Sequence, residues 1–253
     1  SDGVPDELLA LACASHDGEP FHLDGVRAIL ASAGLGVDAL QNTPDMPLDA
    51  ASAFAWELAG HGPESITQNC SGKHAAMLAA CALNGWDRAG YLDPAHPLQQ
   101  LVHRGVEAAA GEPVTAVGTD GCGAPLMAIS LVGLARAFRT FVLAEPGTPE
   151  RRVGDAMRAH PEYVAGTRRA DTWLMRAVPG ALSKMGAEAV QVVALADGRA
   201  LAFKIEDGAE RARGPVLAAA LRRLGVQDPV LERIAAAPLH GGGNVVGEVR
   251  AAF

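Results

Sequence analysis

The chain has 253 residues, of which 49% are hydrophobic and only 4% aromatic, and its 21 basic and 29 acidic residues give a net charge of −8. This length allows one large domain with a sizeable aliphatic core. An acidic chain without a cluster of cations repels the phosphate backbone, so nucleic acid is excluded as a main partner. No apolar stretch approaches the roughly 20 residues of a membrane-spanning helix, and no secretion signal opens the sequence. We therefore expect a cytoplasmic protein without a membrane partner.

Alanine-rich segments with helical spacing alternate with short strand-like segments along the chain. Aspartates suited to helix capping lie near three of the helix starts, at Asp24, Asp171 and Asp207. Helices are expected at 5–14, 24–34, 49–60, 73–84, 97–110, 127–138, 148–159, 171–178, 208–224 and 228–236. Strands are expected at 114–117, 141–143, 189–196, 200–205 and 245–251.

The clearest strand signal is the pair of β-rich runs between Val190 and Ile205. Asp197 and Gly198 separate the runs and supply the positive backbone angles of a tight turn, which predicts an antiparallel hairpin. A dinucleotide-binding fold is excluded, because no GxGxxG motif follows a strand. We therefore predict an α+β fold, with an antiparallel sheet late in the chain packed against helices, in a single domain over residues 1–253.

Lysine is rare in this sequence. Only Lys73, Lys184 and Lys204 are lysines, and the other basic residues are arginines, a preference that suggests a GC-rich bacterial source. Arginine always keeps its proton in proteins, whereas a buried lysine can become a neutral amine that acts as a base or a metal ligand. Each lysine is therefore a candidate for a special role, with survival by chance as the alternative.

The four cysteines are Cys13, Cys70, Cys81 and Cys122. They form no CxxC pair, and their sparse use is typical of a reducing compartment. Cys13 and Cys81 lie in apolar runs and are expected to be small core residues. Cys70 and Cys122 have polar, glycine-rich neighbours, where reactive or liganding sulfurs are found.

A polar turn follows the first predicted helix, in the segment Ala-Cys-Ala-Ser-His-Asp-Gly-Glu-Pro that ends at Pro20. Ser15 can act as a nucleophile if a base lies nearby. Its neighbour His16 is a poor candidate for that base, because adjacent side chains rarely point at the same substrate. The alternative role for Ser15 is that of a turn or capping residue.

The segment Gln-Asn-Cys-Ser-Gly-Lys-His that begins at Gln68 contains three candidate ligands or catalysts. Cys70, Lys73 and His74 would lie on one side of the first turn of a helix that begins near Ser71. The positive end of the helix dipole would lower the pKa of the thiol and disfavour a protonated lysine, which suits metal binding. An ordinary helix start with a solvated lysine is the alternative. A phosphate-binding loop is excluded, because the GxxxxGK[ST] frame is absent.

Two further motifs complete the candidate set. Asp120 and Cys122 flank a glycine in a turn after a predicted strand, where the backbone can approach a ligand and Asp120 can contact an amine. Lys184 lies just before the predicted hairpin and resembles the buried lysine of serine-lysine hydrolases. A structural loop and a solvated lysine are the respective alternatives.

Taken together and in this order, these motifs resemble the L-asparaginase II family of the thermolabile rhizobial type, also called class 3 asparaginases. The resemblance covers essentially the whole chain. The motifs that carry it are Ala-Cys-Ala-Ser-His at 12–16, Asn-Cys-Ser-Gly-Lys-His-Ala at 69–75, Asp-Gly-Cys at 120–122, Val-Ala-Gly-Thr at 164–167 with Asp-Thr at 171–172, Lys-Met-Gly-Ala-Glu at 184–188, residues 204–208, and Asn-Val-Val-Gly at 244–247.

The resemblance implies hydrolysis of L-asparagine to L-aspartate and ammonia, on a fold similar to serine β-lactamases and glutaminases. It matches Ser15 and Lys184 to one of two serine-lysine pairs. It matches Cys70, Lys73 and Cys122 to the ligands of a Zn²⁺ site completed by water. Asp120 matches an active-site acid, and His74 follows the metal-site lysine as in the family and is expected to belong to the catalytic set.

The resemblance also implies an Arg-Ser-x-x-Lys motif upstream of Ser15 that supplies the second pair and, in the family, the principal nucleophile. No Ser-x-x-Lys occurs in these 253 residues. We expect that the N-terminal part of the family domain is missing from this chain, was removed from it, or was lost in evolution. Family members are typically homodimers, so a homodimer is expected. The alternatives are a catalytically silent zinc-binding homologue that binds an amino acid, and an amidohydrolase for another small amide.

Overall fold

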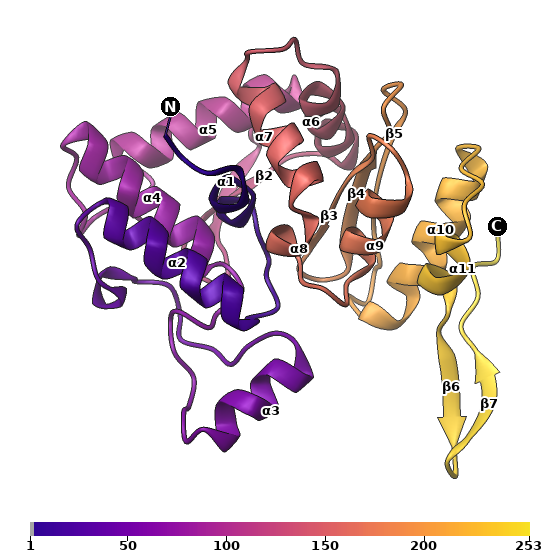
Figure 1. The fold of residues 1–253 in the computed structure, drawn as a ribbon. Coiled ribbons are helices and arrows are strands. Elements are labelled where there is room, and N and C mark those ends of the chain that lie inside the picture. The colour runs from indigo at the N-terminus through magenta and orange to yellow at the C-terminus, as the bar shows by residue number, and fades with distance from the viewer. Residues whose placement is uncertain (1–2) are drawn as a thin grey trace.

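The computed structural model describes residues 3–253. Helices form one side of the molecule and a small antiparallel sheet with its own helices forms the other (Figure 1). The helices are α1 (Asp6–Ala12), α2 (Pro20–Ser32), α3 (Ala50–Leu58), α4 (Ser71–Asn84), α5 (Pro97–Ala110), α6 (Leu131–Leu143), α7 (Pro149–Ala159), α8 (Pro161–Val164), α9 (Ala170–Ala177), α10 (Arg213–Arg223) and α11 (Val230–Ala235), with short 3₁₀ turns at Val37–Ala39 and Glu210–Ala212. The longest helices have 14 residues, and within residues 3–253 none is long and apolar enough to cross a membrane.

The main sheet has the strand order β3 (Leu182–Gly186), β4 (Val190–Ala194), β5 (Ala200–Lys204), and both pairings are antiparallel. Helix α6 packs against β4 and β5, and α9 packs against β3. Two separate two-stranded ribbons pair β1 (Ala116–Thr119) with β2 (Pro125–Ala128), and β6 (Pro238–Gly241) with β7 (Asn244–Glu248). The combination of helices with small antiparallel sheets confirms the predicted α+β class.

Three apolar clusters hold these layers together. One joins α1, α2 and α4 around Leu11, Leu30 and Leu78. A second lies between the sheet and α10 and α11, and a third connects α1 with α7, α9 and β3. Helix α1 takes part in the first and third clusters, so the loop that follows it lies between the helical half and the sheet half.

Close backbone contacts fix that loop. Ser15 N–H donates to the carbonyl of Val164 at 3.0 Å, and Asp17 N–H donates to that of Ala165 at 2.8 Å. The start of α4 lies against the end of α1, where a side chain at Gly72 would collide with the carbonyl of Leu11. The polar turn after α1, the start of α4 and the segment before α9 are thus brought side by side.

The predicted hairpin is confirmed as β4 and β5, with Val190 opposite Lys204. Only Gly198 takes a positive φ, of 85°, so the turn needs one such residue where the sequence suggested two. The expected strand at 141–143 is wrong, because it forms the last turn of α6 and Val142 is buried in the core. The expected helix at 127–138 begins later, because Pro125–Ala128 pairs with β1.

The expected capping aspartates are also corrected. Helix α2 begins at Pro20 with Glu19 as its cap, so Asp24 lies inside the helix. Asp171 lies in the first turn of α9 and is buried, and Arg169 precedes the helix in its place. The side chain of Asp207 accepts a hydrogen bond from the N–H of Ala209 in a turn. The expected helix at 208–224 divides into a 3₁₀ turn and α10, which begins after this turn.

Candidate active site

The hydroxyl of Ser15 lies against the amine of Lys184. Their Oγ and Nζ atoms are 2.7 Å apart, although the residues are 169 positions apart in the sequence. Ser15 comes from the turn after α1, and Lys184 comes from β3, an edge strand of the main sheet. The amine also donates to the carbonyl of Met185 at 2.6 Å. A serine and a lysine in this arrangement can act as nucleophile and base.

Burial lowers the pKa of Lys184 to about 8, which is well below the ordinary value for lysine. The negative charges of Asp171 and Cys70 oppose burial and raise the pKa of Lys184. The positive charge of Arg169 acts with burial and lowers it. An appreciable fraction of the amine is therefore neutral near physiological pH, and a neutral amine can accept the serine proton.

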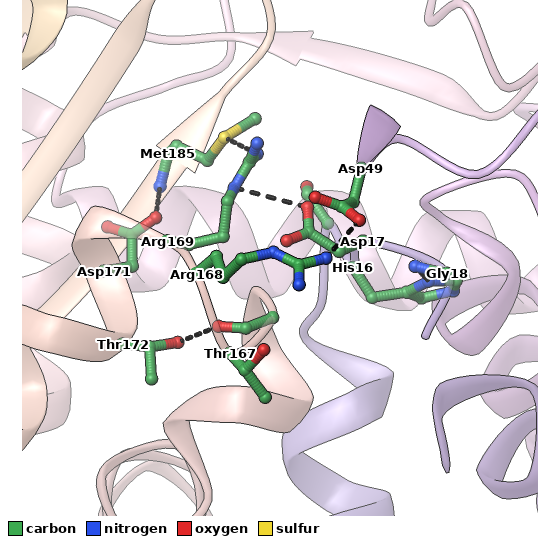
Figure 2. A network of polar contacts seen from close by, with 12 residues as sticks. His16, Asp17, Gly18, Asp49, Thr167, Arg168, Arg169, Asp171, Thr172 and Met185 are labelled. Carbon is green, nitrogen blue, oxygen red and sulfur yellow. Dashed lines mark hydrogen bonds and ion pairs between the residues drawn. The ribbon is translucent and has the colours of Figure 1, made fainter. Parts of the chain in front are cut away.

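Asp171 fixes the strand that carries Lys184. Its buried carboxylate accepts hydrogen bonds from Ser183 Oγ at 2.5 Å, from the N–H of Met185 at 3.0 Å and from Gln191 Nε2 at 2.8 Å. Figure 2 shows the bond between Asp171 and Met185 at the sheet edge. The two residues on either side of Lys184 are thus tied to α9. The sequence suggested only a cap for Asp171, because nothing local shows which strand the carboxylate contacts.

Replacing Asp171 by alanine is expected to lower the free energy of unfolding by about 3 kcal/mol or more, because three buried donors lose their acceptor. Urea unfolding followed by circular dichroism measures this loss. Asp24→Ala is the matched control, since its exposed ion pair with Arg27 is worth less than about 0.5 kcal/mol. Equal effects in both variants would contradict the proposed anchoring role.

A second cluster combines Cys70, Asp120 and Cys122, whose ligand atoms all lie within 4.8 Å of one another. Cys70 immediately precedes α4, which begins at Ser71, earlier than the expected helix at 73–84 and where the candidate ligands need it to begin. Asp120 and Cys122 come from the turn between β1 and β2. This cluster can hold a metal ion, because the ligands of one tetrahedral ion lie roughly 3–4 Å apart and thiolates suit zinc.

Lys73 joins this cluster from the first turn of α4. Its Nζ lies 3.3 Å from Cys122 Sγ and 3.7 Å from Asp120 Oδ2. Burial alone would lower the pKa of Lys73, but its interactions with Cys70 and Cys122 outweigh burial and raise the pKa. These interactions with the sulfur cluster therefore favour the ammonium form of Lys73.

The two cysteines form a coupled pair of free thiols. The hydrogen bond with Cys122 outweighs burial and lowers the pKa of Cys70 to about 6. The same bond, together with burial, raises the pKa of Cys122 to about 12. The first proton therefore leaves the pair easily. Although burial would raise the pKa of Asp120, the hydrogen bond from Cys122 and the charge of Lys73 keep it below its ordinary value, so Asp120 is ionised.

His74, the histidine that follows Lys73 in the sequence, lies beside the sulfur cluster. His74 is buried behind the cluster, with Nδ1 2.7 Å from the hydroxyl of Tyr91 and with no hydrogen-bond partner for Nε2 among the described residues. The hydrogen bond to Cys70 and burial raise the pKa of Cys122, whereas the nearby His74 ring lowers it. His74 therefore neighbours Cys122, and its expected place in the catalytic set stays a prediction.

His16 is a structural residue that links the two clusters. Its Nδ1 accepts the N–H of Gly18, so Nε2 carries the proton and donates to Ser71 Oγ at 2.8 Å. Its own N–H donates to the carbonyl of Asn69, and the Asn69 side chain accepts from Cys70 Sγ. Burial holds the pKa of His16 well below its usual range, so the ring stays neutral. The serine-lysine pair and the sulfur cluster therefore belong to one connected site.

A comparison with protein families shows the class to which this chain belongs. The model of the L-asparaginase II family matches residues 2–251 of the 253. Because the match covers nearly the whole chain, the protein belongs to the L-asparaginase II family. Membership indicates a hydrolase of the asparaginase kind that acts on a small molecule. No curated protein matches the sequence.

Proposed function

We propose that this protein hydrolyses the side-chain amide of L-asparagine to L-aspartate and ammonia, with Ser15 as nucleophile and Lys184 as its base. The observation that carries the proposal is the 2.7 Å contact between Lys184 Nζ and Ser15 Oγ, combined with a pKa of about 8 for the buried amine. The carbonyl of Met185 accepts one N–H of Lys184 and so orients the amine toward the serine.

The reaction follows from these contacts. Ser15 Oγ attacks the amide carbon while its proton moves to Lys184 Nζ. When the C–N bond breaks, that proton passes to the departing nitrogen, which leaves as ammonia, and the acyl group stays on Ser15. Water then gives a proton to Lys184 and its oxygen to the acyl carbon. The C–O bond to Ser15 breaks, the serine regains its proton, and the carboxylate product is released.

We also propose zinc at Cys70, Lys73 and Cys122, with water completing the shell. The donor set fits this ion, because the two sulfurs lie within 4.8 Å of each other, the amine of Lys73 lies 3.3 Å from Cys122 Sγ, and one thiol loses its proton easily. Asp120 is an active-site carboxylate in this arrangement, close enough to serve as a further ligand. A bound zinc ion supplies Lewis acidity toward a carbonyl group or a bound water.

A serine β-lactamase-like arrangement of the fold is part of the proposal. The support is the antiparallel sheet covered by helices, with the catalytic lysine on an edge strand and the nucleophile presented by the helical half. A fold alone does not determine an activity. The substrate assignment therefore depends on the family match and the site.

Incubation of the purified protein with L-asparagine tests the proposal directly. We expect equal amounts of ammonia and L-aspartate, measured by a coupled dehydrogenase assay and by amino-acid analysis. L-Glutamine and other small amides run in parallel identify the preferred substrate. Binding of L-asparagine in a calorimeter without any release of ammonia would contradict hydrolysis and favour a silent amino-acid-binding homologue.

The metal proposal predicts about one zinc ion per chain in freshly purified protein, measured by elemental analysis. Cys70→Ser and Cys122→Ser are expected to lose most of the metal, because serine is a poor zinc ligand. Cys81→Ala is the matched control, since this cysteine is buried in the core away from the cluster and its variant should retain the zinc. A metal-free wild type, or a disulfide between Cys70 and Cys122, would contradict the site.

A further inference from the structure

The guanidinium of Arg169 has a poor set of partners for a largely buried cation. Its Nη2 donates to the thioether sulfur of Met185 at 2.6 Å, and its Nε lies 3.5 Å from Asp17 Oδ1 (Figure 2). Thioether sulfur is a weak acceptor, and no oxygen within residues 3–253 accepts a hydrogen bond from this side chain. The side chain is 22% exposed, so part of it is accessible to an incoming ligand.

Asp17 lies behind this cation and is almost fully buried. Its side chain is 2% exposed, and its Oδ1 has no hydrogen-bond partner among the described residues. The backbone is fixed, because Asp17 N–H bonds to Ala165 and its carbonyl accepts the N–H of Asp49. A side chain at Gly166 would collide with the carboxylate. Asp17 is thus a negative charge in a fixed position that holds the guanidinium in place. It does not use all the N–H groups of the guanidinium as hydrogen-bond donors.

This pair borders the catalytic residues. Asp17 follows Ser15 by two positions on the same extended segment, and Met185 directly follows Lys184. Burial lowers the pKa of Lys184 most, and the positive charge of Arg169 is close enough to lower it further. The guanidinium therefore lies between the two segments that supply nucleophile and base.

The place of Arg169 in the sequence is locally unfavourable. It precedes α9 at the capping position, where helices prefer Ser, Thr, Asp or Asn and where the helix dipole favours negative charge. Its side chain makes no capping hydrogen bond. Arg169 thus breaks a local helix preference while its side chain lies against Asp17 and Met185, and such a conflict is typical of a functional position.

We propose that Arg169 binds the α-carboxylate of the substrate and that Asp17 orients it for this contact. The proposal rests on the proposed function, because it names the part of L-asparagine that the site recognises. A carboxylate can accept two parallel hydrogen bonds from a guanidinium and is a far better acceptor than the sulfur of Met185. The site therefore selects amides that carry a free carboxylate, and Arg169 is a specificity residue.

The test compares two ligands that differ only in this group: L-asparagine and 3-aminopropanamide, in which hydrogen replaces the α-carboxylate. Binding is measured by calorimetry in a Ser15→Ala background, so that no turnover interferes. We expect a preference of roughly 10- to 100-fold for L-asparagine, the range for hydrogen bonds to a charged group. Adding Arg169→Gln should abolish the preference, and Arg169→Lys should restore part of it.

Arg168→Gln is the matched control, because the neighbouring guanidinium is 56% exposed and pairs with Asp49, so its loss should leave the preference intact. If Arg169→Gln fails to fold because Asp17 loses its partner, Asp17→Asn combined with Arg169→Gln removes both charges. An equal loss of affinity for both ligands would overturn the proposal and leave a structural ion pair.

These outcomes are distinct from a failure of the proposed function. A wild type that releases no ammonia but shows an Arg169-dependent preference refutes hydrolysis and supports the carboxylate site. A wild type that hydrolyses L-asparagine, with a preference that survives Arg169→Gln, refutes the carboxylate site alone.

Discussion

Ser15→Ala is expected to lower the rate of ammonia release from L-asparagine by at least about 1,000-fold, because no acyl intermediate can form without the hydroxyl. Residual turnover would come from substrate binding and from the polar groups that remain around the reacting carbonyl. Folding should change little, because Ser15 is only partly buried and Lys184 keeps its bond to the carbonyl of Met185. Steady-state kinetics and thermal unfolding of the same preparation separate the two effects.

Ser32→Ala is the control for this experiment. Ser32 lies in α2 and, among the described residues, its hydroxyl bonds only to the carbonyl of Ile29, so its loss should leave the activity within about twofold of wild type. Undiminished turnover in Ser15→Ala would show that another group attacks the amide. A mass increase on Ser15, trapped with a slow amide or an activated ester and absent in the variant, would identify the nucleophile independently.

The sequence alone indicates those parts of the site whose residues lie close together along the chain. Cys70 and Lys73 share one helical turn, so their proximity follows from helix geometry alone, and α4 begins where the Asn-Cys-Ser-Gly-Lys motif suggested. The meeting of Ser15 with Lys184 is different, because 169 positions separate them. Only the resemblance to a family connected these residues before the structure did.

The features that the sequence did not indicate depend on tertiary contacts. Phe141–Leu143 has strand-like composition, but its apolar side chains continue the buried face of α6, and packing decides the conformation. The sequence does not indicate β3 as a strand, because it is the hydrogen-bonded pairing with β4 that holds this segment as a strand. Asp171 and Asp17 resemble ordinary turn and cap residues until their buried partners are known.

The pH dependence of the reaction should report the amine of Lys184. The folded pKa of about 8 lies below the usual value, so the amine is protonated and inactive as a base at lower pH. We therefore expect kcat/KM for L-asparagine to rise about tenfold per pH unit below pH 7 and to level off above an inflection near pH 8. A flat profile between pH 6 and 9 would contradict a role for this amine as the base.

Lys184→Arg tests the same assignment by fixing the charge. Arginine keeps its proton throughout this pH range, so the variant should lose at least about 1,000-fold in kcat/KM and show no inflection near pH 8. Lys204→Arg is the matched control, because Lys204 is exposed and its amine contacts Glu188 and the carbonyl of Ile205. Of the three lysines, only Lys184 combines burial, a lowered pKa and contact with a serine hydroxyl. Retained activity in Lys184→Arg would assign proton transfer to a different group and leave Lys184 a purely electrostatic role.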